Sequence, residues 1–119
     1  MNKNNYPKVV VLGPSGCGKT TMINRWRGIN IQHHEATLGL EVTPINEGNG
    51  IRYNVWECAG DPNFYGTNRE DYFQGARGAI IIANDDNEYA MFVEQFRRIS
   101  NAPILRTTNN APIGILSHF

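Results

Sequence analysis

Hydrophobic and polar positions along the chain predict an alternation of short strands and helices. Continuous apolar runs at 8–12 and 78–83 are typical of strands that are buried on both faces of a sheet. Apolar residues at helical spacing predict a helix over about 19–27 and another from about 64 or 68 to 74. The same spacing predicts a third helix, capped by the polar residues 84–87 and carrying Tyr89, Phe92, Val93, Phe96 and Ile99.

A hairpin and one more strand complete the pattern. Strands are predicted at 38–45 and 51–57, and the turn chemistry of Glu47-Gly48-Asn49-Gly50 joins them. In the second of these strands Trp56 stands among polar positions. It is either covered by a neighbouring element or exposed as an anchor for a protein partner. The last strand is predicted at 103–107, before a turn and a short apolar tail.

The order of these elements indicates the fold class. Strand, helix, strand, strand, helix, strand, helix, strand implies an α/β fold with a mostly parallel sheet, one antiparallel strand and helices on both faces. The chain has 119 residues, and no linker or repeat divides it. We therefore expect a single domain over residues 1–119.

Composition limits the kinds of partner that the protein is expected to bind and the cellular compartment in which it is expected. Eleven basic and eleven acidic residues give a formal net charge of zero, which does not favour binding to nucleic acid or to an anionic membrane surface. No apolar segment approaches the roughly 18 residues of a membrane span, and the start has no signal-peptide pattern. The two cysteines, Cys17 and Cys58, are expected as free thiols. These features favour a soluble, intracellular protein.

The octapeptide at 13–20 is the strongest chemical signal in the sequence. It reads Gly-Pro-Ser-Gly-Cys-Gly-Lys-Thr and lies between an apolar run and a helical pattern, which is the context of a phosphate-binding loop. Its glycines let backbone N–H groups surround an anion, and the helix N-terminus adds positive potential. The alternative is a glycine-rich turn that binds nothing. Candidate phosphate-binding residues are Gly13, Ser15, Gly16, Cys17, Gly18, Lys19, Thr20 and Thr21.

Two further stretches decide among the proteins that carry such a loop. The loop alone would equally suit a nucleotide kinase or a transporter ATPase. Ala36-Thr37-Leu38-Gly39-Leu40-Glu41-Val42 and Tyr53-Asn54-Val55-Trp56-Glu57-Cys58-Ala59-Gly60 make the chain resemble the small GTPases of the Ras superfamily, and among them the Ran family. The resemblance extends from about 8 to 112. It implies the P-loop small-GTPase fold without its last strand and last helix.

The resemblance also implies a ligand, a metal and residue roles. The ligand would be GTP or GDP with Mg²⁺. Lys19 would reach the β- and γ-phosphates, Thr37 would close over the γ-phosphate, Gly60 would donate its N–H to it, and Asn109 would belong to the base site. The metal ligands would be Thr20, Thr37 and, through water, Glu57.

Protein partners follow from the resemblance as well. They would bind through the strands beside Thr37 and through the face of Trp56, and nuclear-transport factors are the class that the Ran resemblance implies. The acidic C-terminal tail that Ran uses is absent from this chain. The expected location is the cytoplasm, the nucleus or both.

The departures from the family lie in the chemistry. Glu57 replaces the aspartate that holds Mg²⁺ through water, which is expected to weaken the metal site. Asp61 stands where the family has the glutamine that orients the attacking water, and Pro62 follows it. A carboxylate beside the γ-phosphate repels the charge of the transition state. Asp61 is therefore the candidate catalytic residue, in an impaired form, and hydrolysis is expected to be slow or absent.

The base-reading motif is also altered. The family's Asn-Lys-x-Asp appears here as Asn109-Asn110-Ala111-Pro112, without the lysine that covers the base and without the carboxylate that accepts from guanine. Three hypotheses remain open. The chain is a GTP/GDP switch with weak hydrolysis, a degenerate pseudo-GTPase that serves as a protein-interaction module with weak nucleotide binding, or an ATP-preferring P-loop protein.

The predicted elements stop before the family's last strand and last helix, so part of the sheet is expected to be uncovered. Without the last strand and helix, one sheet edge and part of one face would be exposed. Either residues 113–119 fold over this surface, another chain or a second copy covers it, or the sequence is a truncated product.

Overall fold

The computed structural model describes residues 6–28, 40–47, 50–58 and 72–119. In chain order the elements are β1 (Lys8–Leu12), α1 (Lys19–Trp26), β2 (Leu40–Asn46), β3 (Arg52–Cys58), β4 (Gly78–Ile82), α3 (Asp86–Arg97), β5 (Ile104–Thr107) and the 3-10 helix η3 (Ile113–His118). All five predicted strands are present, as are the first and last predicted helices. Most of the helix predicted before residue 74 falls outside the described residues.

The strands form one sheet in the order β2-β3-β1-β4-β5. β1 pairs in parallel with both β3 and β4, and β4 pairs in parallel with β5. β2 is antiparallel to β3, with Thr43 opposite Val55. The predicted α/β fold, with a mostly parallel sheet and one antiparallel strand, is confirmed.

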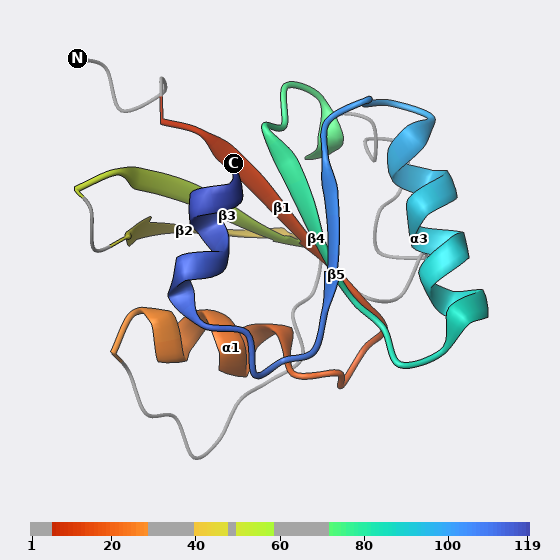
Figure 1. Ribbon diagram of the computed structural model, residues 1–119, viewed down its shortest axis with the longest axis horizontal. Coiled ribbons are helices and arrows are strands. Elements are labelled where there is room, and N and C mark those ends of the chain that lie inside the picture. Colours follow the sequence, from red (N-terminus) through yellow and green to blue (C-terminus); the bar gives the residue numbers. More distant parts are fainter. Residues whose placement is uncertain (1–5, 29–39, 48–49, 59–71) are drawn as a thin grey trace.

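Helices lie on both faces of this sheet, as Figure 1 shows, with α1 and η3 on one side and α3 on the other. The two faces follow from the alternation of side chains along each strand. Val9 and Val11 of β1 pack in the cluster under α1, and Val10 and Leu12 pack in the cluster under α3. Because β1 is central and covered on both faces, its sequence is apolar from Val9 to Leu12.

Local sequence sets the start of α3. The Asp85 side chain accepts hydrogen bonds from the backbone N–H groups of Asn87 and Glu88, as an N-cap residue does. Arg106 of β5 then donates to Asp86 and to the carbonyl oxygen of Ala83. These contacts hold the first turn of α3 against the end of the sheet.

The C-terminal segment is an element that the sequence pattern did not predict. Residues expected as a plain apolar tail form η3, whose Leu116 is fully buried under the α1 face of the sheet. The Phe119 ring lies directly against the Cα atom of Gly78, where a Cβ atom would collide with it. Residues 113–119 therefore fold over this face, which was the first of the alternatives given from the sequence.

Two details of β3 bear on the sequence predictions. The predicted strand began at Ile51, but β3 begins at Arg52 and Ile51 is 44 % exposed, while Tyr53 is buried. Trp56 is half-buried, and the Nζ atom of Lys8 stands 3.6 Å from the centre of its ring.

Within the described ranges no helix has both the length and the apolar character that a membrane crossing needs.

Candidate functional site

Sequence-distant polar residues meet where the parallel strands end. The loop 13–18 follows β1, Glu57 is the second-to-last residue of β3, and Asn109 comes shortly after β5. Ligands of open parallel sheets bind at this edge, because loops and helix N-termini converge there. The structure therefore brings the loop 13–18, Thr20, Glu57 and Asn109 together at this edge.

The loop between β1 and α1 depends on its glycines. A Cβ atom on Gly13 would lie 2.7 Å from the Ile82 carbonyl oxygen and 2.8 Å from the Cys17 sulfur, so no side chain fits there. Gly16 and Gly18 have φ angles of 80° and 98°, which favour glycine strongly. Cys17 donates its N–H to the Pro14 carbonyl at 3.2 Å and closes the turn. The result is a compact loop that leads into α1.

Lys19 is buried in this loop. Its side chain is 5 % exposed in relative terms, and its Nζ atom donates to the carbonyl oxygens of Gly13 at 2.8 Å and Pro14 at 3.0 Å. The ammonium group thus lies across the loop and is satisfied by backbone oxygens. An incoming anion would have to compete with these carbonyls for the same donors.

Thr20 and Glu57 form a direct contact between α1 and β3. Thr20 Oγ1 donates to Glu57 Oε2 at 2.5 Å, and Glu57 is only 3 % exposed. A hydroxyl and a carboxylate oxygen are the hard donors that Mg²⁺ takes in protein sites, usually together with water and phosphate oxygens. The two residues fit the predicted metal site. They could hold the ion only after their mutual hydrogen bond is opened.

Asn109 connects the last strand to the loop. Its Nδ2 atom donates to the Cys17 carbonyl oxygen at 3.0 Å, and its carboxamide occupies the space that a Cβ atom on Gly18 would need. This close approach is a second reason for glycine at position 18. Asn109 therefore lies at the predicted site, with its side chain on the loop backbone.

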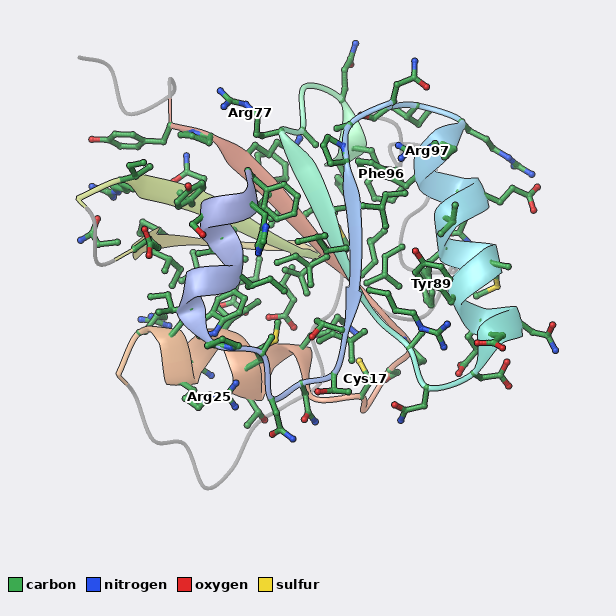
Figure 2. All side chains as sticks on the ribbon, in the orientation of Figure 1. Cys17, Arg25, Arg77, Tyr89, Phe96 and Arg97 are labelled. Carbon is green, nitrogen blue, oxygen red and sulfur yellow. The ribbon has the colours of Figure 1, made fainter. Side chains whose placement is uncertain are left out.

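Arg25 and Trp26 were not predicted as part of this region. Arg25 Nη2 donates to the carbonyl oxygens of Asn109 at 3.0 Å and Ala111 at 2.9 Å. Trp26 Nε1 donates to the same Ala111 oxygen at 3.0 Å. Figure 2 shows Arg25 on α1, beside the segment that leads from β5 to η3. Helical periodicity explains the burial of Trp26, but it carries no signal for these long-range bonds.

Comparison with known proteins identifies the family. A family model described as Ras of Complex, Roc, domain of DAPkinase matches residues 8–111. The chain belongs to this family of Ras-like domains. It is also similar to the GTP-binding nuclear protein GSP1 of Encephalitozoon cuniculi, with 31 % identity over 118 residues. That alignment covers 89 % of this chain and 55 % of the relative, so the chain spans about half the length of that relative.

The match confirms the resemblance stated from the sequence, a Ran-like small GTPase. In this Ras-like domain residues 109–112 stand where the resemblance places the base-reading motif, and they depart from that motif. Asn110 and Pro112 are both exposed, and Pro112 directly precedes η3. The Ala111 carbonyl oxygen accepts hydrogen bonds from the side chains of Arg25 and Trp26. Ser15 and Thr21 of the loop region are also exposed.

Three predicted site residues of the domain lie outside the described residues. They are Thr37, Gly60 and Asp61. Their roles in closing over the γ-phosphate and in positioning water remain predictions from the family resemblance.

Both cysteines are free thiols, as predicted. Burial raises the pKa of the Cys17 thiol, and the nearby Lys19 ammonium opposes this shift only in part. Burial raises the pKa of Cys58 much further, to about 12. Neither thiol is therefore a ready nucleophile at neutral pH. Cys17 serves the loop through its backbone, and Cys58 packs in the core under α3.

Proposed function

We propose that this chain binds GTP and GDP with Mg²⁺ as a Ran-like GTP-binding domain, mainly through their phosphates. The observation that carries the proposal is the convergence of Lys19, Thr20, Glu57 and Asn109 on one glycine-rich loop. Lys19 would exchange its carbonyl partners for the β- and γ-phosphates, while loop N–H groups would bind the remaining phosphate oxygens. Thr20 and Glu57 would hold the ion, Glu57 through water.

The loop residues divide into two proposed groups. Gly13, Gly16, Cys17 and Gly18 would act through their backbone and leave room for the anion. Ser15 and Thr21, at the exposed rim, would act through their hydroxyl groups. Thr37 and Gly60 would complete the phosphate site when triphosphate is bound.

Base selectivity is expected to be poor. Asn109 directs its amide to the loop backbone, and Pro112 offers no side-chain acceptor to guanine. A hydrogen bond to a charged acceptor contributes about 1.5–3 kcal/mol, so its loss weakens affinity roughly tenfold or more. Discrimination between GTP and ATP would suffer most, because the missing carboxylate is the group that reads the base.

Hydrolysis is expected to be weak or absent. The support is the sequence itself, which places Asp61 where the family has its water-orienting glutamine. A negative side chain beside the transferred phosphoryl group opposes the transition state instead of stabilising it. The domain would then act by binding nucleotide, with slow turnover at most.

A second candidate function is a pseudo-GTPase that serves as a protein-interaction module. The observation that favours it is a groove of about 350 Å³ lined by Tyr6, Lys8, Asn54, Trp56 and Arg77. Val42, which lies opposite Trp56 in the sheet, is 45 % exposed. Partners of the nuclear-transport type would bind this face, and the protein would then work in the cytoplasm or nucleus.

Titration of nucleotide-stripped protein with fluorescent GTP, GDP and ATP analogues, with and without Mg²⁺, tests the proposal. Lys19→Ala should abolish binding, because it removes the only side-chain cation that lies across the loop among the described residues. Lys8→Ala is the matched control, since Lys8 begins β1 at the opposite end of the same strand.

The outcomes separate the two candidates. Binding by the wild type and by Lys8→Ala, but not by folded Lys19→Ala, would support the phosphate site. Absence of binding in the wild type would reject it and leave the interaction module. Equal affinity for GTP and ATP would support the poor base selectivity, whereas a strong preference for GTP would contradict it.

A further inference from the structure

The turn 109–111 makes hydrogen bonds near both ends of α1. At one end Asn109 holds the Cys17 carbonyl oxygen, just before α1 begins. At the other end, Arg25 lies in the last turn of α1. Its Nη2 atom donates hydrogen bonds to the carbonyl oxygens of both Asn109 and Ala111. The turn therefore bridges the start and the end of α1, and Arg25 is the side chain that holds two of its three carbonyls.

The bond to Cys17 determines how the loop presents its donors. In a planar trans peptide the C=O and the following N–H point in opposite directions. Because the Cys17 carbonyl faces Asn109, the Gly18 N–H is directed away from Asn109. Gly18 has a φ of 98° and would accept several orientations without such a bond. The hydrogen bond from Asn109 thus fixes the orientation of the 17–18 peptide in which the Gly18 N–H can donate to an anion in the loop.

We propose that Arg25 is a positioning residue of the phosphate loop, which it keeps in its anion-receiving geometry by fixing the turn 109–111. Arg25 holds the backbone of Asn109, and the Asn109 side chain holds the 17–18 peptide. The guanidinium group is suited to this role, because its N–H groups have fixed directions and it stays charged at all relevant pH values. The inference rests on the proposed phosphate-binding function of the loop.

Trp26 supports the same turn but cannot replace Arg25. Its Nε1 atom reaches only the Ala111 oxygen, and the tryptophan is buried in the core under α1. Within the described part of the chain, Arg25 is the side chain that donates to the Asn109 carbonyl oxygen. Removal of the guanidinium group should therefore release Asn109 while α1 and its core stay packed.

The first measurement is amide hydrogen exchange of the nucleotide-free protein, which needs no ligand. Arg25→Ala should accelerate exchange in residues 13–20 by about tenfold, because local opening of the loop becomes easier. Exchange in β4 should stay unchanged. Arg27→Ala is the matched control, since the side-chain hydrogen bond of Arg27 in the described part of the chain stays within the helix region, to Asn24 Oδ1 at 3.2 Å. Equal loop exchange in Arg25→Ala and Arg27→Ala, or faster exchange throughout the sheet, would overturn the positioning role.

The second measurement is the affinity of the same proteins for inorganic pyrophosphate, a probe without a base. Arg25→Ala should weaken it about fivefold to tenfold, the scale of one or two lost hydrogen bonds. Arg25→Lys should be intermediate, because an ammonium group keeps the charge but not the planar geometry. Wild-type affinity in Arg25→Ala or Arg25→Lys would overturn the inference. If the wild type binds no pyrophosphate and no nucleotide, the proposed function fails, and the exchange data alone decide the role of Arg25.

Discussion

The Asn109 side chain donates to the carbonyl oxygen of Cys17 at 3.0 Å, across 92 positions of sequence. This bond ties the end of the last strand to the loop that follows the first one. Between the two residues, the Gly18 backbone passes so close to the carboxamide that no Cβ atom fits. The glycine pattern of the loop therefore serves contacts within the protein as well as the proposed binding of a ligand.

Substitution of Gly18 tests this close approach. Gly18→Ala should destabilise the fold by about 1–2 kcal/mol from its positive φ, with a further loss from the collision with Asn109. Gly16→Ala is the control, because its φ is 80° but no atom lies within 4 Å of the added Cβ position. Urea unfolding of both variants measures the difference. Equal free energies of unfolding would show that the contact with Asn109 contributes nothing.

Glu57 is expected to weaken the dependence of nucleotide binding on Mg²⁺. Its carboxylate reaches Thr20 Oγ1 directly, at 2.5 Å, and the ion must open this bond. Glu57→Asp shortens the side chain by one methylene and should leave room for a hydrated ion. The ratio of affinities with and without Mg²⁺ should therefore rise in Glu57→Asp. Glu41→Asp, a change at an exposed position opposite Glu57 in β2, should leave the ratio unaltered. The same ratio in all three proteins would contradict the prediction.

Restoring an acceptor at the base-reading turn should restore selectivity. Pro112 is exposed and precedes η3, where aspartate is a favourable capping residue, so Pro112→Asp should fold. We expect the preference for GTP over ATP to increase by roughly tenfold, the scale of a hydrogen bond to a charged group. Competition between the two nucleotides measures it. Pro112→Ala controls for the loss of the ring. An equal preference in both variants would mean that the base is not read at this turn.

The cover over the α1 face should contribute substantially to stability. Leu116 of η3 is fully buried, and its truncation in Leu116→Ala should lower the free energy of unfolding by about 2–5 kcal/mol. Met91→Ala, at a position on α3 that is 40 % exposed, should cost far less. Chemical denaturation of the two variants gives the comparison. A small loss in Leu116→Ala would show that η3 is only loosely held.

Much of this arrangement could be predicted from local sequence. The run Val9 to Leu12 has no polar interruption because β1 is covered on both faces, and that property is visible in the residues themselves. The loop motif likewise predicted Gly13, Lys19 and Thr20 as phosphate-binding residues, since a phosphate-binding backbone needs those residue types at fixed spacing. Glu57 and Asn109 were located only through the family resemblance.

Other features depended on contacts that sequence spacing does not encode. Arg25 follows the helical pattern as an ordinary surface residue, yet it fixes a turn 84 positions away. The tail 113–119 has no periodicity that predicts a 3-10 helix, and it folds over the sheet because Leu116 and Phe119 find apolar surface there. The predicted strand included Ile51, because the alternation of apolar and polar residues does not tell where strand pairing ends.

The sequence by itself therefore determined the α/β order, the antiparallel hairpin strand and the position of the phosphate loop. These features arise from interactions between near neighbours and from the periodicity of burial. Only the tertiary structure decided that Asn109 orients the loop, that Thr20 contacts Glu57, and that Arg25 holds the turn beside them. Such contacts form when separate strands end at one edge of the sheet, which no single segment specifies.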